Sequence, residues 1–87
     1  MNTAFILNND IYSFKKADVS VFINTCESLG INITELRDKL NIQDLRAIVH
    51  MIYYSIRDRK DLTIEDMYEL DAEHLELLLQ LYMEVNK

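Results

Sequence analysis

The chain has 87 residues, of which 49% are hydrophobic and 28% are charged, a composition typical of one globular domain. Its net charge of −6 disfavours nucleic-acid binding, which needs a basic contact face. No apolar run approaches the roughly 20 residues that span a bilayer, and the opening MNTAFILNND lacks the basic and apolar regions of a signal peptide. We therefore expect a cytoplasmic protein.

The first predicted element is a β-hairpin over residues 4–14. AFIL and IYSF are short β-prone runs, and Asn8-Asn9-Asp10 between them tolerates the left-handed backbone of a tight turn. A two-stranded hairpin is marginally stable alone, so we expect it to pack against a helix.

A helix is predicted next, over residues 18–29. Apolar residues recur there at spacings of three and four, and Gly30 follows as a typical helix stop. The expected core face consists of Val19, Phe22, Ile23 and Cys26. Because Cys26 is the only cysteine, we expect a small buried hydrophobic residue in a reducing compartment.

Two further helices are predicted over residues 33–40 and 42–57. Asn32 and Glu35 form a capping-box signal for the first, and Asn41 and Asp44 repeat this start signal for the second. The second helix is expected to lie at the centre of the core, because one stripe of it is apolar: Leu45, Ile48, Val49, Ile52, Tyr53 and Ile56.

The last third predicts helices over residues 64–70 and 72–85. Thr63 with Asp66 marks the first start, and Asp71 marks the second. Two apolar pairs are spaced to pack across these starts, Leu62 with Met67 and Leu70 with Leu75. No repeat or linker interrupts the chain. The prediction is a single, mainly α domain over residues 1–87, a compact bundle of four to five helices with a small N-terminal β-hairpin.

The charge is unevenly distributed along the chain. Residues 1–60 hold eight Lys or Arg and seven Asp or Glu, a sum of +1, whereas residues 61–87 hold one Lys and eight acids, a sum of −7. Such a run forms either a solvated helix face or a patch for a basic partner. A helix-turn-helix DNA binder built from the 42–57 and 64–70 helices is disfavoured, because its second helix would be acidic.

No motif for catalysis or cofactor binding is present. The single glycine excludes Gly-rich phosphate loops. The two histidines lie on different predicted helices without a metal-ligand motif, and His50 is expected to be half-exposed beside Arg46 and Arg57. We therefore expect no enzyme activity, no catalytic residue, no cofactor and no metal site.

The predicted 72–85 helix carries more apolar residues than one buried face needs. Leu75, Leu78, Leu79 and Tyr82 form the expected core face, and a polar strip consists of Glu76, Gln80 and Glu84. The remaining apolar surface is either covered by the 18–29 and 33–40 helices or the hairpin, or it binds another chain. The predicted partner-binding residues are Leu77, Leu81 and Val85, with Glu76 and Glu84 on the rim.

Residues 5–70 resemble the small tail assembly chaperones of long-tailed bacteriophages and gene transfer agents. The resemblance lies in the strand-like AFILNNDIYSF, the turn GINITEL from Gly30 to Leu36, and two helix starts, DLRAI from Asp44 and DLTIE from Asp61. It implies a non-enzymatic factor that binds the tape measure protein and tail tube subunits in the cytoplasm of an infected host, with no catalytic residues.

The alternative prediction is a small acidic regulatory protein or inhibitor that occupies a basic site on its partner. Its binding would depend on salt, and its contacts would be Glu65, Asp66, Glu69, Glu73 and Glu76. A homo-oligomer is compatible with both predictions, and neither involves nucleic acid or a membrane.

Overall fold

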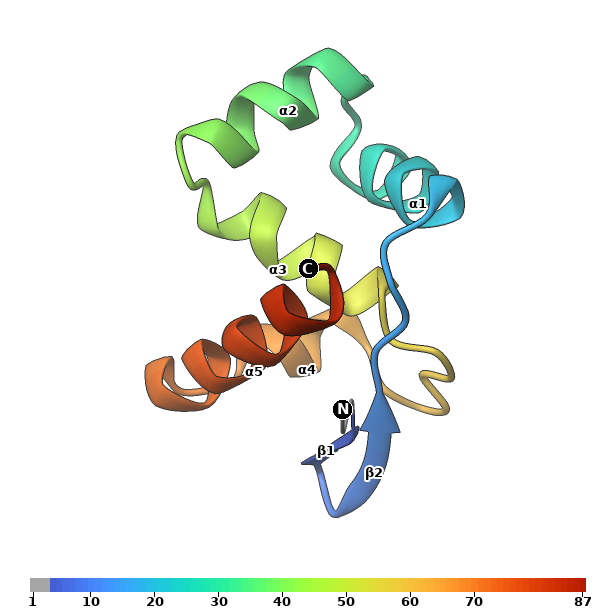
Figure 1. Ribbon diagram of the computed structural model, residues 1–87, viewed down its shortest axis with the longest axis vertical. Helices are drawn as coiled ribbons and strands as arrows, with labels where there is room; N and C mark the ends of the chain where they lie inside the picture. The colour runs from blue at the N-terminus through green and yellow to red at the C-terminus, as the bar shows by residue number, and fades with distance from the viewer. Residues whose placement is uncertain (1–3) are drawn as a thin grey trace.

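The computed structural model describes residues 4–87 and contains within them five helices and one antiparallel hairpin (Figure 1). The elements are β1 (Ala4–Leu7), β2 (Asp10–Ser13), α1 (Val19–Leu29), α2 (Ile33–Asn41), α3 (Leu45–Tyr54), α4 (Ile64–Tyr68) and α5 (Ala72–Val85). The predicted mainly α fold with an N-terminal hairpin is confirmed. The first three residues of the predicted domain lie outside the described range. No helix of residues 4–87 is long and apolar enough to cross a bilayer.

The hairpin has a two-residue turn. Leu7 pairs with Asp10, and the two residues between them, Asn8 and Asn9, have φ angles of 53° and 64°. Positive φ at both central positions defines a type I′ turn, which matches the twist of the two strands. Asparagine tolerates this backbone better than most residues, so the turn sequence selects the register.

Helices α2, α4 and α5 start where the polar caps predicted them. Asn32 accepts a hydrogen bond from the Glu35 backbone N–H at 2.8 Å, and Thr63 accepts one from Asp66 at 3.2 Å. Asp71 caps α5 in the same way, with a hydrogen bond of 2.8 Å from the His74 N–H. Each cap satisfies a backbone N–H that the first helical turn leaves without a partner.

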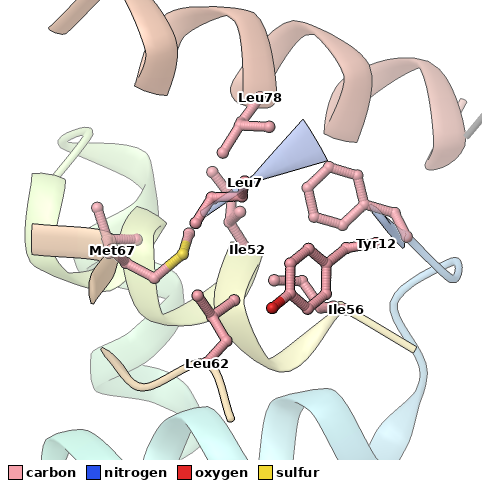
Figure 2. Close-up of a cluster of buried hydrophobic side chains, with 9 residues drawn as sticks. Leu7, Tyr12, Ile52, Ile56, Leu62, Met67 and Leu78 are labelled. Atoms are coloured by element: carbon pink, nitrogen blue, oxygen red, sulfur yellow. The ribbon is translucent and has the colours of Figure 1, made fainter. Parts of the chain in front are cut away.

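Helix α3 lies at the centre of the molecule and separates two apolar clusters (Figure 1). On one side Val49 and Ile52 join the larger cluster, which α4, α5 and the hairpin complete; Figure 2 shows Leu7, Tyr12, Ile52, Ile56, Leu62, Met67 and Leu78 converging there. On the other side Ala47 and Met51 meet α1 and α2 through Val21 and Leu36. Cys26, expected to be buried, is half-buried at the edge of this second cluster.

Helix α3 is shorter at both ends than the predicted 42–57 helix. At its start, Asn41, predicted as a start signal, is instead the last residue of α2. Gln43 has a left-handed backbone with φ of 59°, so the chain turns between α2 and the Asp44 cap. At its end the chain joins the hairpin. Lys15 donates its backbone N–H to the Ser55 carbonyl, and Arg57 donates to Ser13, both at 2.9 Å. These distant backbone partners compete with further helical hydrogen bonds. Helix α4 likewise ends at residue 68, before the predicted residue 70.

The inward faces of α1 and α3 differ from the prediction. Val19 and Ile23, placed on the core face, are 71% and 51% exposed, and α1 instead buries Val21 and Thr25. Leu45, placed on the core stripe of α3, is 62% exposed. The Thr25 hydroxyl donates to the Val21 carbonyl at 2.7 Å, so this polar side chain is satisfied inside the helix and can be buried.

Candidate partner-binding surface

The packed face of α5 is narrow. Leu78 is buried in the larger cluster, and the Tyr82 ring meets Phe14 edge-on with 5.6 Å between ring centroids. The Ser55 hydroxyl donates to the Tyr82 hydroxyl at 3.3 Å, which satisfies the polar end of this half-buried side chain. A hydrogen bond of 2.8 Å from the Ala17 N–H to the Asn86 side chain ties the end of α5 to the start of α1. These contacts fix which side of α5 faces solvent.

The side of α5 away from the core keeps apolar side chains in water. Leu77 and Met83 are each 63% exposed. Both line a shallow hollow of about 560 Å³, together with Gln80, Leu81 and Glu84. We call these five residues the outer face of α5. The surplus of apolar residues in this helix is therefore only partly used by the core.

The predicted contact residues are not equally accessible. Leu77 is exposed, whereas Leu81 and Val85 are half-buried because they pack against the larger cluster. Glu76 and Glu84 are exposed beside them, and Glu84 forms a surface ion pair of 3.4 Å with Lys87. Helix α5 thus brings Leu77, Leu81 and Glu84 to one hollow, while Val85 lies outside its lining. Met83, which was not among the predicted contacts, joins them.

A larger groove of about 700 Å³ lies where α3, α4 and the start of α5 meet. Its size is within the range of protein ligand sites, and most of its lining is apolar. Leu45 and Tyr68 are its exposed walls, and it is lined by Leu45, Arg46, Val49, Met67, Tyr68, Leu70, Ala72 and Leu75. The spacing of Leu70 and Leu75 predicted packing here, but no sequence pattern indicated that Leu45 would stay exposed.

His50 lies behind this groove and was predicted wrongly as a half-exposed residue. It is 3% exposed, with its Nδ1 hydrogen-bonded to the Ser28 hydroxyl at 2.9 Å and its Nε2 hydrogen-bonded to the Tyr68 hydroxyl. Burial, and to a lesser extent the nearby Arg46 charge, lower the pKa of His50 below its ordinary value. The side chain joins α1, α3 and α4 and holds Tyr68 at the groove wall.

Residues 61–87, the acidic third of the chain, contain α4 and α5. Asp66 and Asp71 use their carboxylates as helix caps, so part of the acidity is structural. The remaining acids of these two helices and the turn between them are exposed, and they are Glu65, Glu69, Glu73, Glu76 and Glu84. Three of them, Glu73, Glu76 and Glu84, line the same hollows as Leu77 and thus lie beside the outer face of α5.

In residues 4–87, no three His, Cys, Asp or Glu side chains gather closely enough to hold a metal ion. Near the hairpin, two acids form ion pairs at the protein surface: Asp10 with Lys60 at 2.7 Å, and Asp18 with Lys15 at 3.3 Å. The solvent side of α5 thus carries exposed apolar side chains flanked by acids.

The chain was compared with protein-family models, curated proteins and solved structures, and none of the three comparisons found a match.

Proposed function

We propose that this protein is a non-enzymatic phage tail assembly chaperone that binds an apolar helix of the tape measure protein, and tail tube subunits, through the outer face of α5. The observation that carries the proposal is the exposure of Leu77 and Met83 on a helix whose opposite side is firmly packed. The resemblance of residues 5–70 to these chaperones supports the choice of partner. The proposed place of action is the cytoplasm of an infected bacterium.

The chemistry of the outer face suits a chaperone. Covering one exposed leucine or methionine completely contributes about 1.5–3 kcal/mol. Burial of Leu77 and Met83 therefore supplies a substantial favourable term, and the remaining contacts of a docked helix must add to it to offset the cost of association. Exposed carboxylates at Glu76 and Glu84 keep the face hydrated when no partner is bound. A protein that holds apolar segments during assembly needs both properties on one surface.

The test is co-expression with a tape measure protein, followed by affinity capture and measurement of how much tape measure protein stays soluble. The variant Leu77→Asp/Met83→Asp places two charges in the centre of the outer face. We expect it to fold normally, since both side chains are exposed, and to lose capture. The control is Ile42→Asp, which adds a charge at an isoleucine that is 75% exposed and lies between α2 and α3.

Capture that is equal for wild type and Leu77→Asp/Met83→Asp would exclude the outer face. Loss of capture by Ile42→Asp as well would show a general effect of added charge, and the assignment to α5 would fall with it.

A further inference from the structure

A second apolar surface lies on α1 and α2. Val19, Ile23 and Ile33 are more than half exposed there. They line a hollow of about 480 Å³ with Phe22, Cys26 and Glu27. Next to it is a hollow of about 300 Å³, lined by Phe22, Ile33, Leu36, Arg37, Leu40 and Asn41. The two hollows share Phe22 and Ile33, so they form one continuous surface, which we call the α1–α2 surface.

The fold leaves this surface open because α1 and α2 pack through other residues. Val21 and Thr25 direct α1 onto α3, and Leu36 directs α2 into the same cluster. In Figure 1 α1 and α2 form one end of the molecule, and α5 and the hairpin lie toward the other end. Within residues 4–87 no element covers Val19, Ile23 or Ile33.

The charges on this surface suit a second copy of the same chain. Residues 15–41 hold four Lys or Arg and four Asp or Glu, a sum of zero, so two copies can approach here without the repulsion that the −7 of residues 61–87 would cause. The lining of each hollow contains one charged residue, Glu27 in the larger and Arg37 in the smaller. The acid thus lies at one end of the apolar surface and the base at the other. Two-fold rotation brings the acid of each copy opposite the base of the other copy.

We propose that the protein forms a two-fold symmetric homodimer through the α1–α2 surface. Ile23 and Ile33 form the apolar centre of the interface, and Glu27 of each copy faces Arg37 of the other. A strongly basic partner fits the α1–α2 surface less well, because this surface is neutral overall and contains Arg37. Such a partner would bind more favourably to the acidic surface of α4 and α5. The outer face of α5 takes no part in this interface, so the dimer would present two partner-binding faces.

The first test is sedimentation equilibrium of the wild type, Ile23→Asp and Leu77→Asp. We expect the wild type to dimerise with a dissociation constant at or below about 100 μM, the range of weak but specific interfaces. Ile23→Asp should weaken the dimer at least about tenfold. Leu77→Asp carries the same added charge on α5 and should dimerise like the wild type. Circular dichroism verifies that each variant is folded.

The second test reverses the two interface charges. Glu27→Arg and Arg37→Glu each place like charges opposite one another at both ends of the dimer, and each should weaken it by about threefold to tenfold. The double variant Glu27→Arg/Arg37→Glu restores opposite charges and should recover most of the wild-type affinity.

A wild type that stays monomeric at about 1 mM overturns the proposal, since such an interface would be weaker than specific association requires. A dimer that Leu77→Asp breaks and Ile23→Asp preserves would place the interface on α5 and overturn it as well. A double charge variant no better than the single ones would exclude the Glu27–Arg37 pairing. None of these results affects capture of a partner by α5, which is measured separately.

Discussion

Burial decides what each residue does in this molecule, and neighbouring positions of α5 show it best. Leu78 is buried in the larger cluster, whereas Leu77 beside it in the sequence is 63% exposed. The two leucines are chemically identical, so their contributions to folding and to binding separate only through the direction in which the helix points them.

Truncating these two leucines should therefore have very different effects on the free energy of unfolding. Leu78→Ala leaves a cavity in the core and should lower the free energy of unfolding by about 2–5 kcal/mol. Leu77→Ala should change it by no more than about 0.5 kcal/mol, as expected for an exposed side chain. Urea unfolding monitored by circular dichroism measures both. Equal losses would mean that Leu77 is packed against another part of the chain.

His50 links stability to pH. Because its pKa in the folded protein lies below the ordinary value of 6.5, the unfolded chain takes up the proton at a higher pH than the folded protein does. Neutral His50 therefore contributes its full stabilisation of the folded protein above about pH 6.5. This stabilisation is lost as the pH falls from there toward the lowered pKa of His50 in the folded protein.

The variant His50→Gln should be less stable than wild type at about pH 8, because it disturbs the contacts with Ser28 and Tyr68, and its stability should fall less between about pH 7 and pH 5. The measurement is the urea midpoint at each pH. His74→Gln, at the first turn of α5, is the control for removing a histidine elsewhere. A wild-type pH slope in His50→Gln would show that His50 does not titrate in this range.

At the scale of elements, the hairpin turn offers the sharpest prediction. Asn9 has a φ of 64° at the second position of the type I′ turn, where glycine is the favoured residue. Asn9→Gly should preserve or raise the free energy of unfolding, and Asn9→Ala should lower it by about 1 kcal/mol, because alanine tolerates left-handed backbone poorly. Thermal unfolding of both variants tests this. A loss with glycine as large as with alanine would contradict the turn assignment.

The sequence predicted the elements well because the signals for them are local. Caps such as Asn32 and Thr63 act within one helical turn, so the starts of α2 and α4 could be read directly. The end of α3 could not be predicted in this way. It depends on backbone hydrogen bonds to residues some 40 positions away in sequence, Ser13 at the end of the hairpin and Lys15 just after it. Local patterns carry no information about such partners.

The inward faces were harder to predict than the elements. Helix α1 has apolar residues on more than one face, and the pattern alone does not tell Val19 and Ile23 from Val21. His50 was predicted to be half-exposed because it lies beside Arg46 and Arg57 at the edge of the apolar stripe. In the structure Ser28 and Tyr68 satisfy both of its ring nitrogens inside the fold. Only the arrangement of three helices brings those hydroxyls together. The exposure of Leu45 at the groove likewise depends on how the helices are arranged, which the local sequence pattern does not show.

At the scale of the whole molecule, uncovered apolar surface on the last helix was predicted on better grounds. An apolar arc much wider than one buried face leaves some residues uncovered whichever way the helix turns. The structure keeps Leu77 open and half-buries Leu81 and Val85. It also sets the apolar outer face beside exposed acids, so either feature offers a basis for binding.

The most direct test of the account is the salt dependence of partner binding. Isothermal titration of wild type with a soluble helical segment of a tape measure protein, at about 0.05 M and 0.5 M NaCl, separates apolar contact from charge attraction. If the outer face of α5 holds the partner, the affinity should change by less than about threefold and Leu77→Asp should abolish binding at both salt concentrations. A loss of more than about tenfold at high salt, with Leu77→Asp binding like wild type, would contradict the account and point to the acidic residues instead.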